Sequence, residues 1–425
     1  MPLLRCFFCG LARYQLYYSP QAGFPAALAA GFWRRPLAAK PPTPVRDKDL
    51  KGLKYFKVLA PLLDRLHRDA TTRDRAGNRR LFYDQYACLI LLYFFNPIIK
   101  SLRGIQRAST LDKVQRLVGG RRVSRGSLSE ASRVFDPELL RAIIGDLAKQ
   151  AVPLTQGKEA EALRGLTAVD GSLLPALPKM AWALWTDENH RAAKMHLHFD
   201  VLKGIPTQVS VTTANDSERD QLRVSMKPGG FYVFDRGYRD WTFFQEIATA
   251  GASFVGRVQN NTVIHTDQEL PLTAAAQAAG VVRDVQIKQT GNERHKNNLK
   301  HPLRIVVIDT GKRLLNGQPD LLVLCTNRLD LPAEMVAQAY RYRWTIELFF
   351  RWFKCILGCR HLLAISRDGV TIQIYLAIIA SLLISLWTGR KPNIRTLEMI
   401  HFYVTGWATF AELMTHLNEL KQSTK

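Results

Sequence analysis

The order of the apolar segments predicts a mixed α/β fold. Three strand-like runs are followed by a helix, a strand, a helix, a further strand and, after a β-rich block, a helix that carries one acid among bases. The short runs alternate as half-buried strands do, and the longer segments between them repeat at helical spacing. The hydrophobic content of 47% is that of a globular chain, so wholesale disorder is excluded.

The N-terminal part of the chain is predicted to hold a poorly ordered extension and a helical domain. Residues 1–48 are rich in Ala, Pro, Gly and Arg and show no sustained period. Residues 49–160 have helical periodicity and a basic surface, which includes Arg103, Arg107, Arg116, Arg121, Arg122 and Arg125. We interpret this region either as an all-helical DNA-binding domain or as a helical cap whose arginines are merely solvated.

Residues 161–258 and 329–392 are expected to form the α/β core. Between them, residues 259–328 contain strand-like runs with polar connectors, which predicts a β-rich insertion. Residues 393–425 are predicted to form a helical tail. This order of elements is that of a ribonuclease-H-like core. The apolar run 372–387 is expected to be a buried helix, because about 16 residues are short for a bilayer.

Two aspartates follow apolar runs of the core. Asp170 follows LTAV and precedes Gly171, and the strand is predicted to end there; Asp235 follows FYVF, with Gly237 two residues on. Open α/β sheets bind ligands at the ends of their strands, and a glycine admits close approach of a phosphate. Either aspartate alone is commonly a turn residue, so the case for a site depends on a further acid.

The segment YRYRWTIELFFRWFK, residues 340–354, contains neither Gly nor Pro and is predicted to be one continuous helix. One stripe of that helix holds Tyr340, Arg343, Glu347 and Lys354, with Arg351 and Trp344 close to it. The opposite side is apolar and holds Tyr342, Ile346, Phe349 and Phe353, with Phe350 at its edge. An ordinary amphipathic helix shows the same division. A lone carboxylate among cations, in a chain with a net charge of +23, favours cation and phosphate binding instead.

The spacing of Tyr340, Arg343, Glu347 and Lys354 resembles the Y-R-E-K signature of bacterial DDE transposases of the insertion-sequence-four family. Asp170 in DGS and Asp235 in DRGY match the first and second acidic motifs of that family. The resemblance implies that Asp170, Asp235 and Glu347 are catalytic and hold two Mg²⁺ ions, for which Mn²⁺ can substitute. Such carboxylates suit a hard cation, and paired ions about 4 Å apart activate water and stabilise a departing oxygen. DNA-binding roles are implied for Tyr340, Arg343, Lys354, Arg236 and Arg351.

The resemblance implies a transposase that binds the terminal inverted repeats of an insertion sequence, cleaves by metal-dependent hydrolysis and joins 3′-hydroxyl ends to target DNA. It also implies a homodimer assembled on DNA, located in the cytoplasm at the nucleoid and not in a membrane. Two alternatives stay open: a metal-dependent nuclease with the same core but no strand transfer, and a non-catalytic DNA-binding relic. Joined products from a donor and a target plasmid would distinguish a transposase from the nuclease. Metal-dependent cleavage would distinguish it from the non-catalytic relic.

The insertion departs from the hairpin-forming relatives, which use a Trp there to receive a flipped base. No Trp lies between Trp241 and Trp344. Either the flipped base stacks on Trp241, Tyr238 or Trp344 instead, or the hairpin-forming step of this chain differs from that of the relatives.

Other residues give weaker signals. Cys6 and Cys9 form a C-x-x-C pair with no second pair at zinc-site spacing, and the six cysteines are scattered as in a reduced cytosolic protein. His196 and His198 share one face of a strand, where outward-facing histidines are commoner than a metal pair. Glu218, like Asp220, is expected to cap a helix start, with an added acid at the site as the second option.

Overall fold

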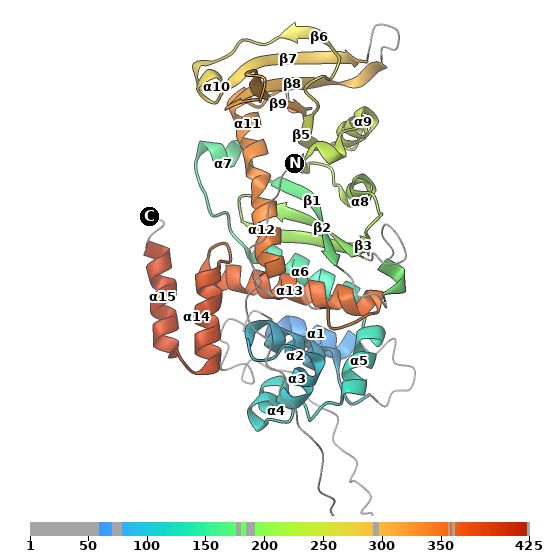
Figure 1. Ribbon diagram of the computed structural model, residues 1–425, viewed down its shortest axis with the longest axis vertical. Coiled ribbons are helices and arrows are strands. Elements are labelled where there is room, and N and C mark those ends of the chain that lie inside the picture. The colour runs from blue at the N-terminus through green and yellow to red at the C-terminus, as the bar shows by residue number, and fades with distance from the viewer. Residues whose placement is uncertain are drawn as a thin grey trace, which may run out of the picture. The chain divides into compact units, whose positions relative to one another are not determined.

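The fold is built on a nine-stranded mixed sheet (Figure 1). The computed structural model describes residues 59–69, 79–175, 180–183, 192–291, 297–355, 358 and 362–422. In their order across the sheet, the strands are β3 (Ile205–Thr213), β2 (Ala192–Asp200), β1 (Leu166–Pro175), β4 (Phe231–Phe234), β5 (Ser253–Val258), β9 (Pro319–Thr326), β8 (Asn297–Arg313), β7 (Val281–Thr290) and β6 (Ile264–Glu269). The expectations for residues 1–48, including a zinc site at Cys6 and Cys9, lie outside the described residues.

Seven helices of the described residues precede the sheet. They are α1 (Ala60–Asp69), α2 (Tyr83–Phe95), α3 (Leu102–Ala108), α4 (Asp112–Val118), α5 (Arg125–Val134), α6 (Pro137–Gln150) and α7 (Lys158–Ala162). Helix α6 begins where the sequence indicates, because the side chain of Asp136 accepts a hydrogen bond from the backbone N–H of Glu138 at 3.0 Å. The helical character expected for residues 49–160 is therefore found in the described part of that range.

The other helices alternate with the strands or follow them. They are α8 (Glu218–Ser225), α9 (Trp241–Thr249), α10 (Ala274–Ala278), α11 (Ala333–Tyr342), α12 (Trp344–Cys355), α13 (Arg367–Thr388), α14 (Ile394–Thr405) and α15 (Phe410–Gln422). Two short 3-10 turns, Ala181–Ala183 and Arg236–Tyr238, complete the described elements. The predicted order, three strands followed by a helix, a strand, a helix and a strand, is confirmed by β1 to β5 with α8 and α9.

Strand pairing brings the two sequence-predicted aspartates to one level of the sheet. Strands β1, β2 and β3 are antiparallel, whereas β4 is parallel to β1 and β5 is parallel to β4. The parallel register pairs Ala168 with Val233. Asp170 and Asp235 each lie two residues farther along, so they stand side by side on neighbouring chain segments.

The prediction that the first strand ends at Asp170 is wrong. Strand β1 continues to Pro175, which pairs with Ala192 of β2. Pairing with β4 ends at Ala168, so the later part of β1 has a strand on one side only. The antiparallel partner supplies the backbone hydrogen bonds that keep this part of β1 extended.

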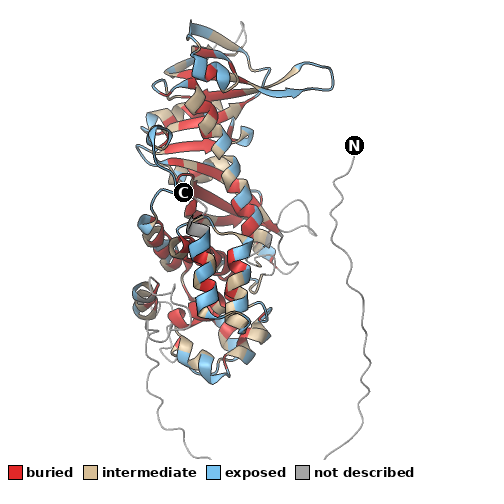
Figure 2. Ribbon diagram, turned by 90° about the vertical axis from the view of Figure 1, so that its left-hand side faces the viewer, coloured by how far each residue is buried: buried red, intermediate tan, exposed pale blue. Residues whose placement is uncertain are grey.

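Helices cover both faces of the sheet, and apolar side chains divide between two clusters. Ala168 and Val233 belong to the cluster that includes α6, α12 and α13, while their neighbours Val169 and Phe234 belong to the cluster that includes α8 and α9. This division follows from the strand geometry, in which successive side chains point to opposite faces. Most strand residues of the core are buried, as Figure 2 shows.

Helix α13 is long and apolar enough, by length and composition, to cross a membrane, and it is the one such helix among the described residues. Its residues from Gly369 to Ser385 are buried within the protein. It packs against α2, α5, α6 and β3. A core helix of this kind was expected for residues 372–387.

The predicted continuous helix over residues 340–354 is interrupted at Arg343, so that prediction is wrong in one detail. The N–H of Arg343 donates to the carbonyl of Tyr340 at 3.1 Å, a three-residue spacing that tightens the backbone. The hydroxyl of Thr345 donates to the carbonyl of Tyr342 at 2.7 Å and so competes with the helical ladder. Ile346, Phe349, Phe350 and Phe353 are buried, as the predicted apolar side requires.

Strands β6 to β9 extend the core sheet, because β9 pairs antiparallel with β5 from Val255↔Thr326 onward. A buried ion pair fixes this extension. Nη2 of Arg304 lies 2.6 Å from Oδ2 of Asp284, Nε lies 2.8 Å from Oδ1, and the side chains are 6% and 3% exposed. Nη1 of Arg304 also donates to the carbonyl of Leu331, just before α11.

Replacing Asp284 by Ala is expected to lower the free energy of unfolding by about 3–5 kcal/mol, because it leaves the Arg304 guanidinium buried without its counter-ion. Chemical denaturation measures the change. The control is Glu269→Gln, which removes the exposed partner of Arg283 and is expected to cost about 1 kcal/mol or less. Equal losses in the two variants would contradict the assigned role of the buried pair.

Candidate active site

Asp170 and Asp235 form a pair of partly buried carboxylates. Oδ1 of Asp170 accepts a hydrogen bond from the N–H of Gly171 at 2.8 Å, and Oδ1 of Asp235 accepts one from the N–H of Gly237 at 2.7 Å. The second bond caps the turn Arg236–Tyr238 and holds the Asp235 carboxylate at the end of β4. The two acids interact electrostatically.

Glu218 is a third acid at this place, contributed by the first residue of α8. A Cβ atom placed on Gly171 would lie within 2.9 Å of the carboxyl carbon of Glu218, and closer still to Oε1. Nζ of Lys194 lies 3.8 Å from Oε1 of Glu218. The expectation that Glu218 caps the helix is wrong, because Ser217 does so by accepting from the N–H of Asp220 at 3.4 Å. Ser217 was the better cap by residue type, which was the available signal.

Two of the three carboxyl groups, those of Asp170 and Glu218, have raised pKa values. Burial, then the charge of Glu218 and, more weakly, that of Asp235, raise the pKa of Asp170 to about 7 against the opposing N–H of Gly171 and the more distant Arg343. Burial also raises the pKa of Glu218, which Lys194 opposes. The buried hydroxyl of Tyr238 lies within electrostatic range of all three acids, and its pKa is raised by burial and by their charges. Carboxylates in such a setting attract cations.

Arg343 connects Glu347 to this group of acids. Its Nη2 lies 2.6 Å from Oε1 of Glu347, and its guanidinium carbon lies 5.5 Å from the centre of the Tyr340 ring. Arg343 also interacts electrostatically with Asp170. The structure therefore brings Tyr340, Arg343 and Glu347 together as the sequence predicts, with Glu347 held by Arg343.

The other predicted DNA-binding residues lie around this group. Lys354 is half-buried, seven residues beyond Glu347 and so roughly 10 Å farther along α12. Arg236 and Arg351 are exposed, and within the described ranges neither forms an ion pair with an acid.

The carboxylate oxygens at this place fit a hard divalent cation, although they are not arranged as a complete coordination site. Asp170, Asp235 and Glu218 supply carboxylate oxygens, the ligands that Mg²⁺ and Mn²⁺ accept. In the part of the chain that the structure describes, no three acids, histidines or cysteines are grouped closely enough to hold a metal ion.

His196 and His198 lie beneath α8 and do not face outward, contrary to the reading favoured from the sequence. Nε2 of His196 is 2.7 Å from the Thr212 hydroxyl, and Nε2 of His198 is 3.0 Å from that of Ser225. Burial, with nearby Lys194 for the first and Lys227 for the second, lowers the pKa of each histidine to about 4. They line a cavity that Glu218 and Tyr238 also line.

Comparisons with known proteins indicate a family for the chain. The sequence pattern described as the transposase DDE domain matches residues 161–383, which contain Asp170, Glu218, Asp235 and Glu347.

Named relatives give the same result. A chain of Sinorhizobium fredii that is named as a transposase is 29% identical over 239 residues, which cover 56% of this chain and 64% of the relative. A transposase named for an insertion sequence element of Geobacillus stearothermophilus is 26% identical over 53% of this chain and 57% of its own length. Another, from Synechocystis, is 24% identical over 63% of this chain and 72% of its own length. The chain thus spans less than two thirds of the first two relatives.

The fold was also similar to a chain in the structure of the piggyBac transposase synaptic complex with hairpin DNA. The TM-score is 0.39 and the identity is 12%, with 87% of this chain and 84% of that chain covered.

The raised pKa of Asp170 leads to a pH-dependent prediction. Asp170 has a pKa of about 7 in the folded chain and an ordinary value of 3.8, so ionising it destabilises the fold increasingly as the pH rises from about 4 through 7. Asp170→Asn should therefore exceed the wild type in free energy of unfolding by roughly 1–4 kcal/mol at pH 8, and the difference should shrink toward pH 4. Chemical denaturation between pH 4 and pH 8, in the presence of a metal chelator, measures this difference in free energy of unfolding. A difference that is the same at every pH would contradict the assignment.

Proposed function

Since the chain belongs to the transposase DDE domain family, we propose that it is a DNA transposase that cleaves at the ends of an insertion sequence and joins the 3′-hydroxyl ends to target DNA. The observation that carries the proposal is the family match over residues 161–383, within which Asp170 on β1 and Asp235 just after β4 stand side by side.

We assign residues 161–258 and 329–392 to a ribonuclease-H-like core, 259–328 to its insertion and 393–425 to a C-terminal tail. The assignment is supported by the strand order β3-β2-β1-β4-β5, in which three antiparallel strands are followed by two that run parallel to β1. In such a core an acid on β1, an acid just after β4 and an acid on the helix that follows the last strand would meet at one place.

Asp170 and Asp235 would hold the divalent metal ions, Mg²⁺ with Mn²⁺ as a substitute, and Glu347 would join them. When bound, these ions activate the attacking water and stabilise the departing oxygen. Arg343 is the group that would change partners when DNA binds, because its Nη2 lies 2.6 Å from Oε1 of Glu347. A DNA phosphate offers its guanidinium a bidentate partner, and the exchange frees Glu347 for the metal.

The remaining DNA contacts of the site are assigned to Tyr340, Lys354, Arg236 and Arg351. A displaced base requires an accessible aromatic ring nearby. Tyr238 is 1% exposed and Trp241 is partly buried against Phe244, whereas Trp344 is 51% exposed and follows Arg343 directly. Trp344 is therefore the best of the three aromatic candidates.

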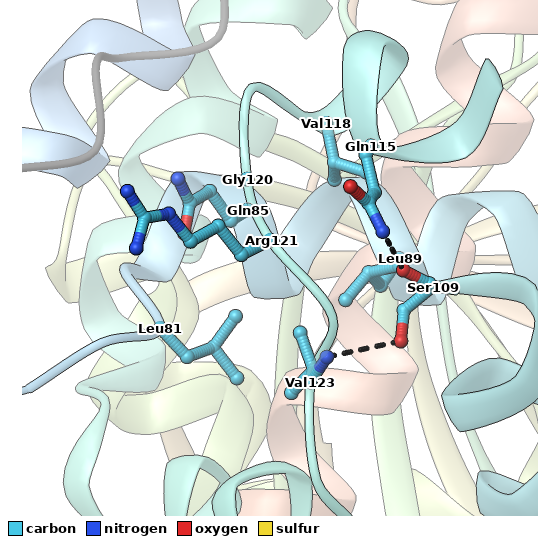
Figure 3. A pocket seen from close by; sticks show the side chains of 9 residues that line it. All are labelled: Leu81, Gln85, Leu89, Ser109, Gln115, Val118, Gly120, Arg121 and Val123. Carbon is cyan, nitrogen blue, oxygen red and sulfur yellow. Dashed lines mark hydrogen bonds between the residues drawn. The ribbon is translucent and has the colours of Figure 1, made fainter. Parts of the chain in front are cut away.

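We further propose that the helices of residues 49–160 bind DNA. Arg103, Arg107, Arg116, Arg121, Arg122 and Arg125 are exposed. The loop that carries Arg121 is fixed, because Nε2 of Gln85 donates to the carbonyl of Gly119 at 3.0 Å and the N–H of Val123 donates to the Ser109 hydroxyl at 3.1 Å. Figure 3 shows Arg121 extending from this loop, away from Ser109. Exposed arginines on a fixed loop are suited to phosphate contacts.

The partners would be the terminal inverted repeats and a target DNA, bound by a homodimer in the cytoplasm. The net charge of +23 supports a polyanionic partner. A nuclease without strand transfer is the remaining alternative, and joined donor–target products distinguish the two.

Asp170→Asn and Asp235→Asn should each reduce strand cleavage to background while DNA binding is retained, because each removes a metal-holding carboxylate. The substrate is DNA that carries the inverted repeats flanking the coding sequence, incubated with Mg²⁺ and a target plasmid, and cuts and joined products are mapped. The control is Asp267→Asn on β6, whose carboxylate pairs with Lys288 at 2.9 Å. Wild-type cleavage by either site variant would remove that aspartate from the mechanism.

Arg121→Ala combined with Arg122→Ala should weaken binding to all DNA sequences. Each lost phosphate contact is expected to lower the slope of log affinity against log salt by about 0.9, so the pair should lower it by about 2. Lys149→Ala, an exposed change on α6, is the control and should leave the slope unchanged. A wild-type slope in the double variant would contradict a DNA-binding role for this loop.

A further inference from the structure

We propose that Glu218 is a further metal-holding carboxylate of the catalytic site, reached from the opposite face of the sheet, and that Gly171 must lack a side chain to admit it. The inference rests on the proposed function, since it assigns a ligand to the same site. It differs from the three-acid arrangement implied by resemblance, in which Glu347 completes the set.

The route of Glu218 to the site follows from the strand geometry. Asp170 lies on the α12 face of β1, as Ala168 does, and Gly171 lies on the α8 face. Any larger residue at position 171 would place Cβ within 2.9 Å of the Glu218 carboxyl carbon. Because β4 no longer pairs with β1 at this level, the edge of β1 is open there. Glu218 therefore fills the side-chain space of Gly171 and stands next to Asp170.

The charges around Glu218 support a cation-binding role. The cation that faces Glu218, Lys194, lies 3.8 Å away and also donates to the carbonyl of Asp216 at 3.0 Å. The second cation near these acids is Arg343, which is paired with Glu347. The ammonium of Lys194 lies farther from Glu218 (3.8 Å) than the guanidinium of Arg343 lies from Glu347 (2.6 Å). Glu218 is thus the less tightly paired acid and the one assigned to complete a cation site with Asp170 and Asp235.

Mn²⁺ binding to the full chain, measured by titration calorimetry without DNA, tests the proposal. Glu218→Gln should weaken Mn²⁺ binding at least about tenfold. The matched control is Asp220→Asn, which changes an exposed carboxylate two residues along α8 that pairs with Arg223. It should bind Mn²⁺ as the wild type does. Equal affinities for Glu218→Gln and Asp220→Asn, or no Mn²⁺ uptake by the wild type, would overturn the proposal.

A double-mutant cycle tests the position of Glu218 independently. Gly171→Ala should displace the Glu218 carboxylate and weaken Mn²⁺ binding by a factor similar to that of Glu218→Ala. In the Glu218→Ala background the space is vacant, so Gly171→Ala should have no further effect. Effects that multiply would overturn the proposed contact.

Failure of this inference is distinguishable from failure of the proposed function. Strand cleavage by the wild type, and its loss in Asp170→Asn, test the proposed function independently of Glu218. If cleavage depends on Asp170 but the Mn²⁺ affinity is unchanged when Glu218 is replaced, this inference is overturned and the proposed transposase function stands.

Discussion

The mutual repulsion of carboxylates held at one level of a parallel strand pair is the constraint on which the rest of the site depends. The register Ala168↔Val233 forces Asp170 and Asp235 to lie side by side, and the partly buried Asp170 also faces Glu218. Holding like charges together in this way is unfavourable. That cost is consistent with a site whose stable state includes bound cations, and it explains why the surrounding elements present Arg343 and Lys194 to the acids.

Each of these two cations interacts with the acids from a different face of the sheet. Arg343, at the junction of α11 and α12, holds Glu347 and faces Asp170, and its guanidinium lies over the Tyr340 ring. Lys194, on β2, lies under α8 beside Glu218. The tightened backbone at Arg343 fits this role, because a local departure from α-helical spacing is commonly found at functional positions. The two faces thus contribute separate acid–base pairs to one edge of β1.

Periodicity and local motifs predicted those parts of the molecule that depend on nearby residues. The order of strands and helices, the end of β4 at Asp235 and the apolar side of α12 follow from local spacing. The position of Glu218 did not follow, because it depends on the missing side chain of Gly171, 47 positions earlier in the sequence. The break at Arg343 accompanies a hydroxyl bond that Thr345 makes three residues back, a local effect that the residue types alone did not signal. The burial of His196 depends on where α8 packs. Tertiary contacts of this kind leave no periodic signal.

Strands β7 and β8, which extend the sheet, help to position the same site through the backbone that leads into α11. Arg304 on β8 pairs with Asp284 on β7 and also donates to the carbonyl of Leu331, two residues before α11 begins. Helix α11 leads directly to Arg343 and then to Glu347 on α12. The buried pair therefore fixes the start of the segment that presents the third predicted acid. Because a guanidinium buried without its carboxylate is costly, strands β7 and β8 and the beginning of α11 must be placed together. The long insertion is in this way a structural support for the helix that completes the site.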